Sequence, residues 1–529
     1  MHKFFTSLFR PSAFGTFGFV SDFVFRDSDF ALWQFASLGF QSPQAAVTIP
    51  ACMLALPRRH PHRCRVGSDS QAAGVRHSEP IWRQNMCQYV FPAEELAQRR
   101  NRLFDIIGDQ AVAVLQGSDY AQAMARFRQY NEFYYFTGIE VAHAYVVMDG
   151  RTRKTTLFLP RESQISKEHD GVVPSVDNVE YTIQLTGVDE VRGIESLGQR
   201  LQNPGVVYTM FQQSQGFNMT YGTLSSWYAG VTADPWDGRL SRPAQFIDKL
   251  RSRYSGLEFR DLTPIIDGMR LIKSEREIAL CRRAGQLTAI GVCEALRSTR
   301  PGVFEYQLDA VMRYHYLAGG ARDQGYPAII AGGPNAWHGH YQINNCPLKD
   351  GDMVLVDCAP DYHYYTSDIG RMWPVNGKYS PAQRELYGYV VEYHKVLLAG
   401  IRPGRLYADI QAEAAEIMRA RIDGWKFSKP LYKTAAQEMC EFPWHLSHAV
   451  GMCVHDGSPR SKPLEPGIVF SVDPQMKVPD ERLYIRCEDT VVVTESGIEN
   501  FTAAAPLELD DTEKMMTEPG LLQTFAPIG

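Results

Sequence analysis

The sequence of 529 residues lacks several features that would place it in a specialised class of protein. It contains no run of about 18 uninterrupted apolar residues, so it offers no candidate transmembrane helix and we expect no membrane partner. It also lacks an excess of basic residues. The net charge of −6 provides no general attraction to nucleic acid, so we expect no nucleic-acid partner either.

The ten cysteines show no CxxC pair and no paired spacing of the kind found in disulfide frameworks. Several of them fall inside apolar runs, as Cys281, Cys293, Cys358 and Cys487 do. This pattern is typical of buried, reduced thiols. We therefore expect a cytoplasmic protein.

Common catalytic loops are missing as well. There is no P-loop, no GxGxxG turn and no GxSxG nucleophile elbow in a suitable context. The glycine-containing stretch GGPNAWHG has neither a following helical pattern nor a lysine, which argues against a phosphate-binding loop. Apolar residues make up 44% of the chain and charged residues 22%, as in ordinary globular proteins.

The length predicts more than one domain. Residues 1–85 carry nine Lys and Arg against five Asp and Glu, with no clear helical or strand period. We expect them to form a poorly ordered extension, which is either a targeting segment or sequence upstream of a true start at Met86. We expect a first domain over 86–262, a second over 263–509, and a loosely docked tail over 510–529.

The first domain has the pattern of an α/β unit. Pro92–Ile107 predicts a helix, and Ala111–Leu115, Ala144–Met148 and Thr155–Leu159 predict strands. A basic helix and a strand within Asp248–Leu262 lead to the second domain.

In the second domain, the stretch 347–373 holds two prominent acidic residues. Asp357 ends the apolar run Met353–Val356, and Asp368 lies in a second extended run, Tyr364–Trp373. A turn at Ala359–Asp361 would make this a β-hairpin with both carboxylates on adjacent strands. A carboxylate at the end of a hydrophobic strand is costly to bury unless it is paired or binds a metal.

The second domain also repeats itself. The same order of elements occurs twice: a helix, an RPG segment, a second helix and a strand that ends in Asp. In both copies the Asp lies at the same distance after a proline, Asp357 after Pro347 and Asp473 after Pro463. Such a duplication predicts two equivalent strands near a pseudo-twofold axis, with converging carboxylates. The second copy continues into Leu483–Val493, which carries Glu488.

Four carboxylates in one pocket would need cations to stay ionised. One imidazole among them favours Mn²⁺, Co²⁺, Fe²⁺ or Zn²⁺, and five ligands suit two ions. Taken alone, each acid is more readily a solvated strand residue, but the matched positions in the two halves favour the metal site. The candidate ligands are Asp357, Asp368, His448, Asp473 and Glu488.

Three further residues lie beside these runs. His340 and His455 are either satisfied local histidines or groups that stabilise an oxyanion or move a proton. Arg486 shares a strand face with Glu488 by alternation, and it either holds an acidic ligand or substrate or forms an ordinary ion pair.

From Met86 to about Leu509 the sequence resembles the aminopeptidase P and prolidase group of dinuclear metallopeptidases. The motifs that carry the resemblance are FRQYNEFYYFTGI, MRLIKSEREIALCRRAGQLTAIG, VDCAPDYHYYTSDIGRMWPVNGKYS, LSHAVGMCVHDG and YIRCEDTVVVTESG. The resemblance implies an α/β N-terminal domain followed by an α+β pita-bread catalytic domain with internal pseudo-twofold duplication.

The resemblance also implies roles for individual residues. The five candidate ligands would bind two metal ions, usually manganese, and a bridging hydroxide would attack the peptide carbonyl. His340 and His455 would stabilise the transition state, Tyr326 and Arg486 would contact the substrate site, and Asp473 would help to accept the proton. The implied reaction removes the residue that precedes a proline in second position, and the implied assembly is a homodimer or homotetramer.

The chain departs from the family pattern at two positions. The fourth ligand is normally Glu in an EPG context, and here it is Asp473 in VDPQM. The family also has a His four residues before the ligand His, whereas position 444 is Trp, with His445 one residue away. Two alternatives therefore stay open: a prolidase restricted to Xaa-Pro dipeptides, and a non-catalytic pita-bread module that binds peptides or proteins.

Overall fold

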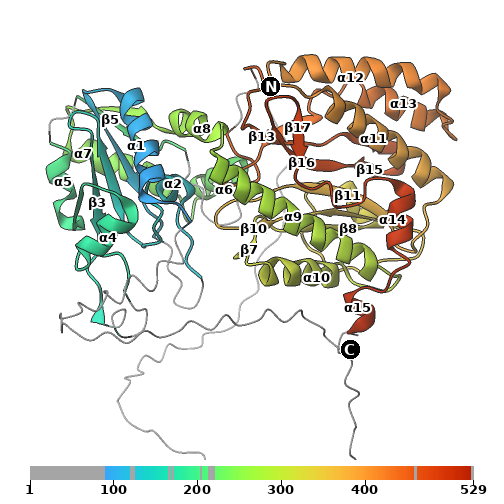
Figure 1. Cartoon of the computed structure of the whole chain (residues 1–529), viewed down its shortest axis with the longest axis horizontal. Coiled ribbons are helices and arrows are strands. Elements are labelled where there is room, and N and C mark those ends of the chain that lie inside the picture. The colour runs from blue at the N-terminus through green and yellow to red at the C-terminus, as the bar shows by residue number, and fades with distance from the viewer. Residues whose placement is uncertain are drawn as a thin grey trace, which may run out of the picture. The chain divides into compact units, whose positions relative to one another are not determined.

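The computed structural model describes residues 90–119, 126–164, 168, 172–202, 205–212, 221–457 and 461–525 (Figure 1). The predicted extension, residues 1–85, lies outside the described residues. Within the described ranges, no helix is long and apolar enough to cross a membrane.

The first part of the described chain forms a six-stranded mixed sheet of order β4-β3-β2-β1-β5-β6, flanked by helices. The apolar run predicted as a strand is β1, whose first five residues are fully buried. Helix α1 (Ala93–Ile107) follows Pro92 and is capped at its C-terminus by Gly108, whose φ of +73° suits glycine. The strands are β1 (Ala111–Gln116), β2 (Tyr145–Asp149), β3 (Lys154–Leu159), β4 (Glu190–Gly193), β5 (Val206–Thr209) and β6 (Glu258–Asp261).

Three of these strands, β1, β2 and β3, agree with the predicted ranges to within one residue at each end, and β6 lies within the predicted link Asp248–Leu262. The strands β4 and β5 were not predicted. The antiparallel pairs β1–β2 and β2–β3 form a meander, and the remaining pairs are parallel. The helices are α1 (Ala93–Ile107), α2 (Asn131–Thr137), α4 (Val179–Thr186), α5 (Leu197–Arg200), α6 (Tyr221–Ala233), α7 (Arg242–Arg253) and the connecting helix α8 (Thr263–Leu271).

The second part is built on a sheet of order β12-β13-β16-β11-β9-β8, to which β17 is added beside β16. The order is symmetric about the central pair β11–β16, because β9 and β13 flank it and β8 and β12 lie outermost. The predicted duplication is therefore confirmed. The strands are β8 (Ile329–Gly332), β9 (Met353–Asp357), β11 (Ile369–Pro374), β12 (Leu446–Ala449), β13 (Val469–Val472), β16 (Glu488–Val493) and β17 (Ile498–Asn500).

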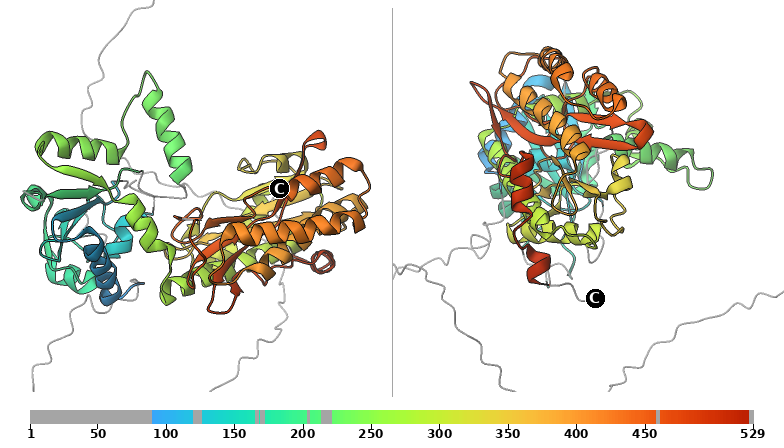
Figure 2. Two further views of the ribbon diagram at one scale, coloured as in Figure 1. Left: turned by 90° about the horizontal axis from the view of Figure 1, so that it is seen from above. Right: turned by 90° about the vertical axis from the view of Figure 1, so that its right-hand side faces the viewer.

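Helices and two small strand pairs complete each half of this domain. Helices α11 and α12 lie side by side, in orange in Figures 1 and 2, and pack on the sheet through one large apolar core. The pairs are β7 (Asp323–Gln324) with β10 (Pro360–Asp361) and β14 (Gln475–Val478) with β15 (Leu483–Arg486). The helices are α9 (Glu275–Ser298), α10 (Glu305–Ala318), α11 (Pro381–Gly400), α12 (Tyr407–Arg421) and α13 (Pro430–Met439).

Two local expectations need correction. The turn between the acidic strands was expected at Ala359–Asp361, but these residues include β10, and the chain reverses at Tyr362–Tyr365 instead. The expected loose tail also has structure: α14 (Leu509–Met515) and α15 (Leu521–Thr524) pack on the second domain. Glu513 is 8% exposed and accepts hydrogen bonds from Tyr379 and Arg384, which fastens α14.

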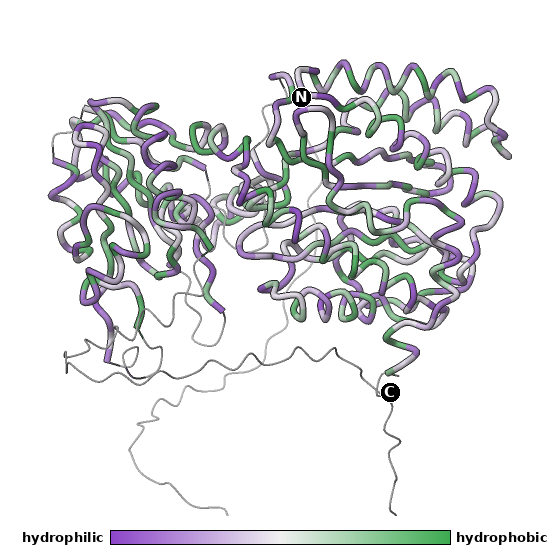
Figure 3. Tube along the Cα trace, viewed as in Figure 1, coloured by the Kyte–Doolittle hydropathy of each residue, from purple (hydrophilic) through white to green (hydrophobic). Residues whose placement is uncertain are grey.

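Hydrophobic residues gather on the strands of both domains, and hydrophilic ones on the outer turns of the helices (Figure 3). In the sheet of the second domain this leaves strands whose side chains are almost all buried, such as β11 and β16. A polar group on such a strand must find a partner within the protein. The acidic residues at the ends of these strands are therefore informative about function.

Candidate metal centre

Three of the predicted ligands meet around a single glycine at the centre of the sheet. Gly370 on β11 pairs with Asp357 at the end of β9 and with Glu488 at the start of β16. Asp368 lies two residues before Gly370. A Cβ at position 370 would lie 3.0 Å from Glu488 Cβ, so a larger residue there would have to push the Glu488 side chain aside by a few tenths of an ångström.

Asp473 reaches the same place from the other half of the sheet. It directly follows β13, whose last residue, Val472, pairs with Asp489 on β16. Asp473 therefore lies next to Glu488, in the position that corresponds to Asp357 in the first half. The converging carboxylates expected from the duplication are present.

His448 on β12 completes the set. One ligand atom from each of Asp368, His448 and Glu488 lies within 4.8 Å of the other two, which is close enough to share an ion. The Nε2 atom of His448 is 3.5 Å from Oδ2 of Asp368. Asp357 and Asp473 lie outside this group of three and are joined to it through Arg486 and Tyr326.

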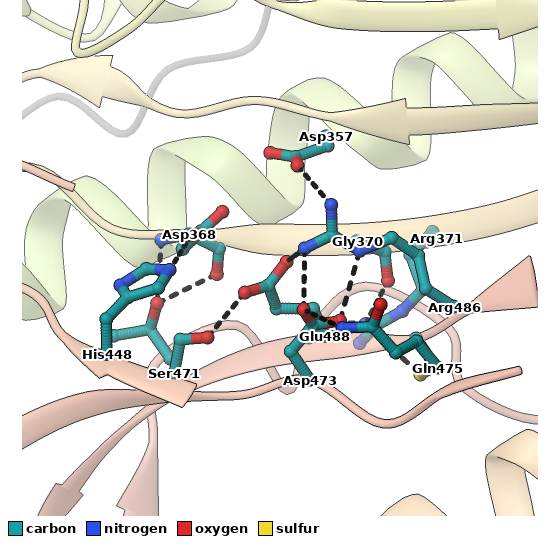
Figure 4. Close-up of polar contacts among 12 residues, drawn as sticks. Asp357, Asp368, Gly370, Arg371, His448, Ser471, Asp473, Gln475, Arg486 and Glu488 are labelled. Atoms are coloured by element: carbon teal, nitrogen blue, oxygen red, sulfur yellow. Dashed lines mark hydrogen bonds and ion pairs between the residues drawn. The ribbon is translucent and has the colours of Figure 1, made fainter. Parts of the chain in front are cut away.

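Arg486 stands among the carboxylates (Figure 4). Its Nη1 donates to Asp357 Oδ2 at 2.7 Å, and its Nε and Nη2 donate to the two oxygens of Asp473, each at 3.0 Å. A further contact joins Nη2 to Glu488. The planar guanidinium suits such forked contacts and fixes the orientation of three acids at once.

The Tyr326 hydroxyl bridges the two acids of the first half. It lies 2.8 Å from Asp357 Oδ1 and 2.6 Å from Asp368 Oδ1, and the side chain is buried. The sequence-based expectation put this tyrosine at the substrate site. In the structure its polar contacts go to the carboxylates themselves.

The electrostatics of this cluster favour bound cations. Burial, followed by the charges of neighbouring carboxylates, raises the pKa of Asp368 and Glu488 well above the ordinary range. Burial also raises the pKa of Asp473, although Arg486 acts in the opposite direction. The single positive charge of Arg486 therefore does not neutralise the negative charges of the four buried carboxylates. Divalent cations would do so, and oxygen ligands with one imidazole suit them.

The two other predicted histidines lie at the open side of the cluster. The ring of His455 is 3.9 Å from that of His448, centroid to centroid, and both His455 and His340 are exposed. The protein atoms around His455, followed by the charge of His340, lower the pKa of its imidazole. A neutral imidazole in this position can donate or accept a proton.

His445 does not take the place of the missing family histidine. It is fully buried, its Nε2 lies 2.8 Å from the carbonyl of Met439, and its ring packs on Tyr393. Trp444 is 51% exposed. The family position is therefore occupied by an exposed indole, and the neighbouring imidazole belongs to the core.

Sequence reasoning missed the residues that support the ligands. Ser471 donates to Glu488, and Thr490 accepts from the backbone N–H of Asp368 at 2.7 Å and donates to its carbonyl at 2.8 Å. Ser471 lies two before Asp473 and Thr490 two after Glu488, so strand alternation placed each on its ligand's face. Behind them, Arg371 donates to Asp489 at 2.7 Å and to the Glu488 carbonyl. No spacing in the sequence pointed to Arg371.

Two family models match the chain. "Aminopeptidase P, N-terminal domain" matches residues 96–205, and "Metallopeptidase family M24" matches residues 279–495. The Xaa-Pro aminopeptidase of Escherichia coli is 30% identical over 446 residues, which cover 80% of this chain and 97% of that protein. Human Xaa-Pro aminopeptidase 3 is 29% identical over 486 residues, which cover 87% of this chain and 90% of that protein.

Solved structures show the same likeness. A putative aminopeptidase P from Bacillus anthracis matches with a TM-score of 0.69 at 23% identity, covering 82% of this chain and all of that chain. Aminopeptidase P from E. coli with the inhibitor Pro-Leu matches with a TM-score of 0.65 at 29% identity, covering 81% of this chain and 98% of that one. The chain belongs to the aminopeptidase P family of M24 metallopeptidases.

Proposed function

We propose that this protein is a metal-dependent aminopeptidase that releases the N-terminal residue from peptides with proline in second position. The observation that carries the proposal is the buried set of four carboxylates with His448 at its edge, in a chain whose family has this activity in its name. Asp357, Asp368, His448, Asp473 and Glu488 would hold two divalent ions, most readily Mn²⁺, since oxygen donors dominate the set.

Bound ions would supply the Lewis acidity that activates water and polarises the peptide carbonyl. The protein's own groups then have distinct tasks. Tyr326 orients Asp357 and Asp368, while Arg486 orients Asp357, Asp473 and Glu488. Ligands fixed by such neighbours need little rearrangement when substrate binds.

Proton transfer is assigned to Asp473 and the two exposed histidines. The buried Asp473 carboxylate, held by Arg486, is proposed to accept the proton released by the attacking water. His455 and His340, at the open side, are positioned to donate to the oxygen of a tetrahedral intermediate and to contact the peptide. We further propose that Tyr326 and Arg486 form part of the wall against which the substrate lies.

The proposal extends to location and assembly. All seven cysteines in the described part of the chain are free thiols, which supports a reducing, cytoplasmic compartment. A homodimer or homotetramer is the assembly proposed from the family resemblance. Trp236, which is 96% exposed, provides apolar surface for such a contact, and light scattering of the purified protein measures the mass directly.

The test is a peptide panel with added Mn²⁺. We expect hydrolysis of Xaa-Pro-Xaa tripeptides and none of matched Xaa-Ala-Xaa peptides. Cleavage restricted to Xaa-Pro dipeptides would identify a prolidase instead. The proposal also predicts about two Mn²⁺ ions per chain in metal analysis. Fewer than about one ion per chain after loading, together with no cleavage, would favour the non-catalytic peptide-binding module.

The Asp368→Asn variant tests whether cleavage in this panel depends on the metal site. The variant removes a ligand charge that the ions require, so the rate should fall at least about 100-fold, the equivalent of a few kcal/mol of transition-state stabilisation. Asp350→Asn is the matched control, because Asp350 is exposed at the edge of the same domain and bonds Asn376. Equal rates for Asp368→Asn and the control would refute the metal mechanism.

A further inference from the structure

Two loops carry the proposed chemistry of the catalytic domain, and both meet the N-terminal domain. The first is the turn 361–365, between the proposed ligands Asp357 and Asp368. The second is the loop 449–456, which follows His448 and contains His455. A direct backbone bond joins the two regions, from Thr366 N–H to the Gly451 carbonyl at 2.9 Å.

One side chain of the N-terminal domain contacts both loops. Arg128 Nε donates to Asp361 Oδ2 at 2.8 Å, and Nη2 lies 3.5 Å from the Met452 carbonyl. Its third nitrogen, Nη1, donates to Asn131 Oδ1 at 2.8 Å, and Asn131 Nδ2 in turn donates to the same Met452 carbonyl at 3.0 Å. Arg128 is only 7% exposed, so these contacts form away from water.

The turn reached by Arg128 is held in an unfavourable conformation. Tyr364 has a φ of +74°, which side-chain-bearing residues rarely adopt. Asp361 Oδ1 accepts the Tyr364 N–H at 2.9 Å, so the carboxylate that pairs with Arg128 also caps this strained residue. The Arg128 guanidinium additionally lies over the Tyr364 ring, 4.5 Å from its centroid.

Other contacts of Tyr364 also come from the N-terminal domain. Its ring stacks on Tyr134 at 3.6 Å, and its hydroxyl accepts the Gln129 N–H at 2.8 Å and bonds Glu140. The conformation of the turn is therefore maintained by the neighbouring domain. Only two residues, Thr366 and Ser367, separate the turn from Asp368.

We propose that Arg128 is a positioning residue for the metal centre, which fixes the Asp357–Asp368 turn and the His448–His455 loop relative to each other. The inference rests on the proposed function. Arg128 contacts none of the five proposed ligands, so it acts through the loops. The branched shape of the Arg128 guanidinium is needed for this role, because Nε and Nη2 contact different loops. A lysine ammonium is a single point of charge and would not reach both loops in this way.

The test compares Mn²⁺ binding to the full chain with Arg128 and with Arg128→Lys or Arg128→Met. After removal of metal, titration calorimetry should show binding about 10- to 100-fold weaker for Arg128→Met, the usual cost of losing support behind ligands. Arg128→Lys should fall between this variant and the wild type. At saturating Mn²⁺ most of kcat should return, because the ligands themselves are intact.

Arg153→Met is the matched control, since Arg153 pairs with Asp105 on the surface of the same domain and is half exposed. It should bind Mn²⁺ as the wild type does. Asn131→Ala provides a second variant that keeps the Arg128–Asp361 pair and removes one bond to Met452. Asn131→Ala should weaken Mn²⁺ binding by less than Arg128→Met does. It keeps the inference testable if Arg128→Met does not fold.

Two results separate this inference from the proposed function. If the wild type binds Mn²⁺ and cleaves Xaa-Pro peptides, but folded Arg128→Lys and Asn131→Ala bind Mn²⁺ with unchanged affinity, the positioning role is refuted. The Arg128 variants could also lose activity only in proportion to their loss of folded protein, with unchanged Mn²⁺ affinity. That result would likewise refute the positioning role and make Arg128 a purely structural contact. A wild type that neither binds Mn²⁺ nor cleaves overturns the proposed function itself.

Discussion

Asp489 should be one of the most sensitive positions for stability, although it is not a proposed ligand. It is 1% exposed and accepts three hydrogen bonds, from Arg371 at 2.7 Å, His394 at 2.8 Å and Thr502 at 2.5 Å. Although burial opposes ionisation, Arg371 and His394 hold the pKa of Asp489 below its ordinary range. Asp489 is therefore an ionised carboxylate at neutral pH.

Asp489→Asn preserves the shape of the side chain and removes its charge. The Arg371 guanidinium, 2% exposed, then lacks its counter-ion. The new amide can donate to His394 Nε2 only if the ring hydrogen moves to Nδ1, which has no partner within the described residues. Breaking a buried ion pair on one side costs about 3–5 kcal/mol, and we expect a loss in unfolding free energy of that size.

Equilibrium urea unfolding followed by circular dichroism measures this loss. Asp105→Asn is the control, because its pair with Arg153 is exposed on both sides and is worth less than about 1 kcal/mol. The pH dependence gives a second check. Since the pKa of Asp489 is depressed on folding, its contribution is present above about pH 4 and is lost as the pH falls below that value. A loss in Asp489→Asn no larger than in the control would refute the reasoning.

Two other residues give predictions of a different kind. Burial lowers the pKa of His445 from 6.5 to about 4. Between these values the imidazole is protonated in the unfolded chain but neutral in the folded protein. The unfolding free energy should therefore fall by about 2 kcal/mol from pH 7.5 to pH 5 because of this residue. His445→Gln should show a smaller acid loss in urea unfolding; identical pH profiles would contradict the assignment. Tyr326→Phe removes the hydroxyl that orients Asp357 and Asp368, and calorimetry should show Mn²⁺ binding weakened at least about tenfold. Tyr314→Phe, at a 57% exposed tyrosine, should leave Mn²⁺ affinity unchanged, and equal affinities for the two variants would argue against an orienting role.

The ligand set could be proposed from sequence because each acid terminates or begins a buried strand. A carboxylate such as Asp357 at the end of an apolar run has a large cost of burial, so its presence there indicates a partner or an ion. The equal spacing of Asp357 and Asp473 from their prolines indicated a duplication, and the symmetric sheet order about β11–β16 confirms it. Alternation along the expected single strand Leu483–Val493 placed Arg486 beside Glu488. The two side chains are in contact, but the strand is divided: Arg486 ends β15 and Glu488 begins β16.

Other features followed only from the tertiary structure. The turn between the acidic strands lies at Tyr362–Tyr365, because β10 pairs with β7 from another part of the chain. The assignment of His445 to the core depended on its contacts with Met439 and Tyr393, which adjacency to Trp444 did not reveal. In each case the contact that sets the local structure joins two segments, and no periodic pattern in the sequence indicates that these segments pair.

Local periodicity and spacing in the sequence were enough to predict the α/β pattern of the first domain, the duplicated pattern of the second and the residue types of the candidate metal centre. The tertiary structure decided how those residues are held. Arg128 and Asp361 are 233 positions apart, and Arg128 and Met452 are 324 apart. A hydrogen bond over such a separation depends on how whole domains pack, which local patterns do not encode. The residues that could bind metal were therefore visible in the sequence, while the support that the N-terminal domain gives them was visible only in the fold.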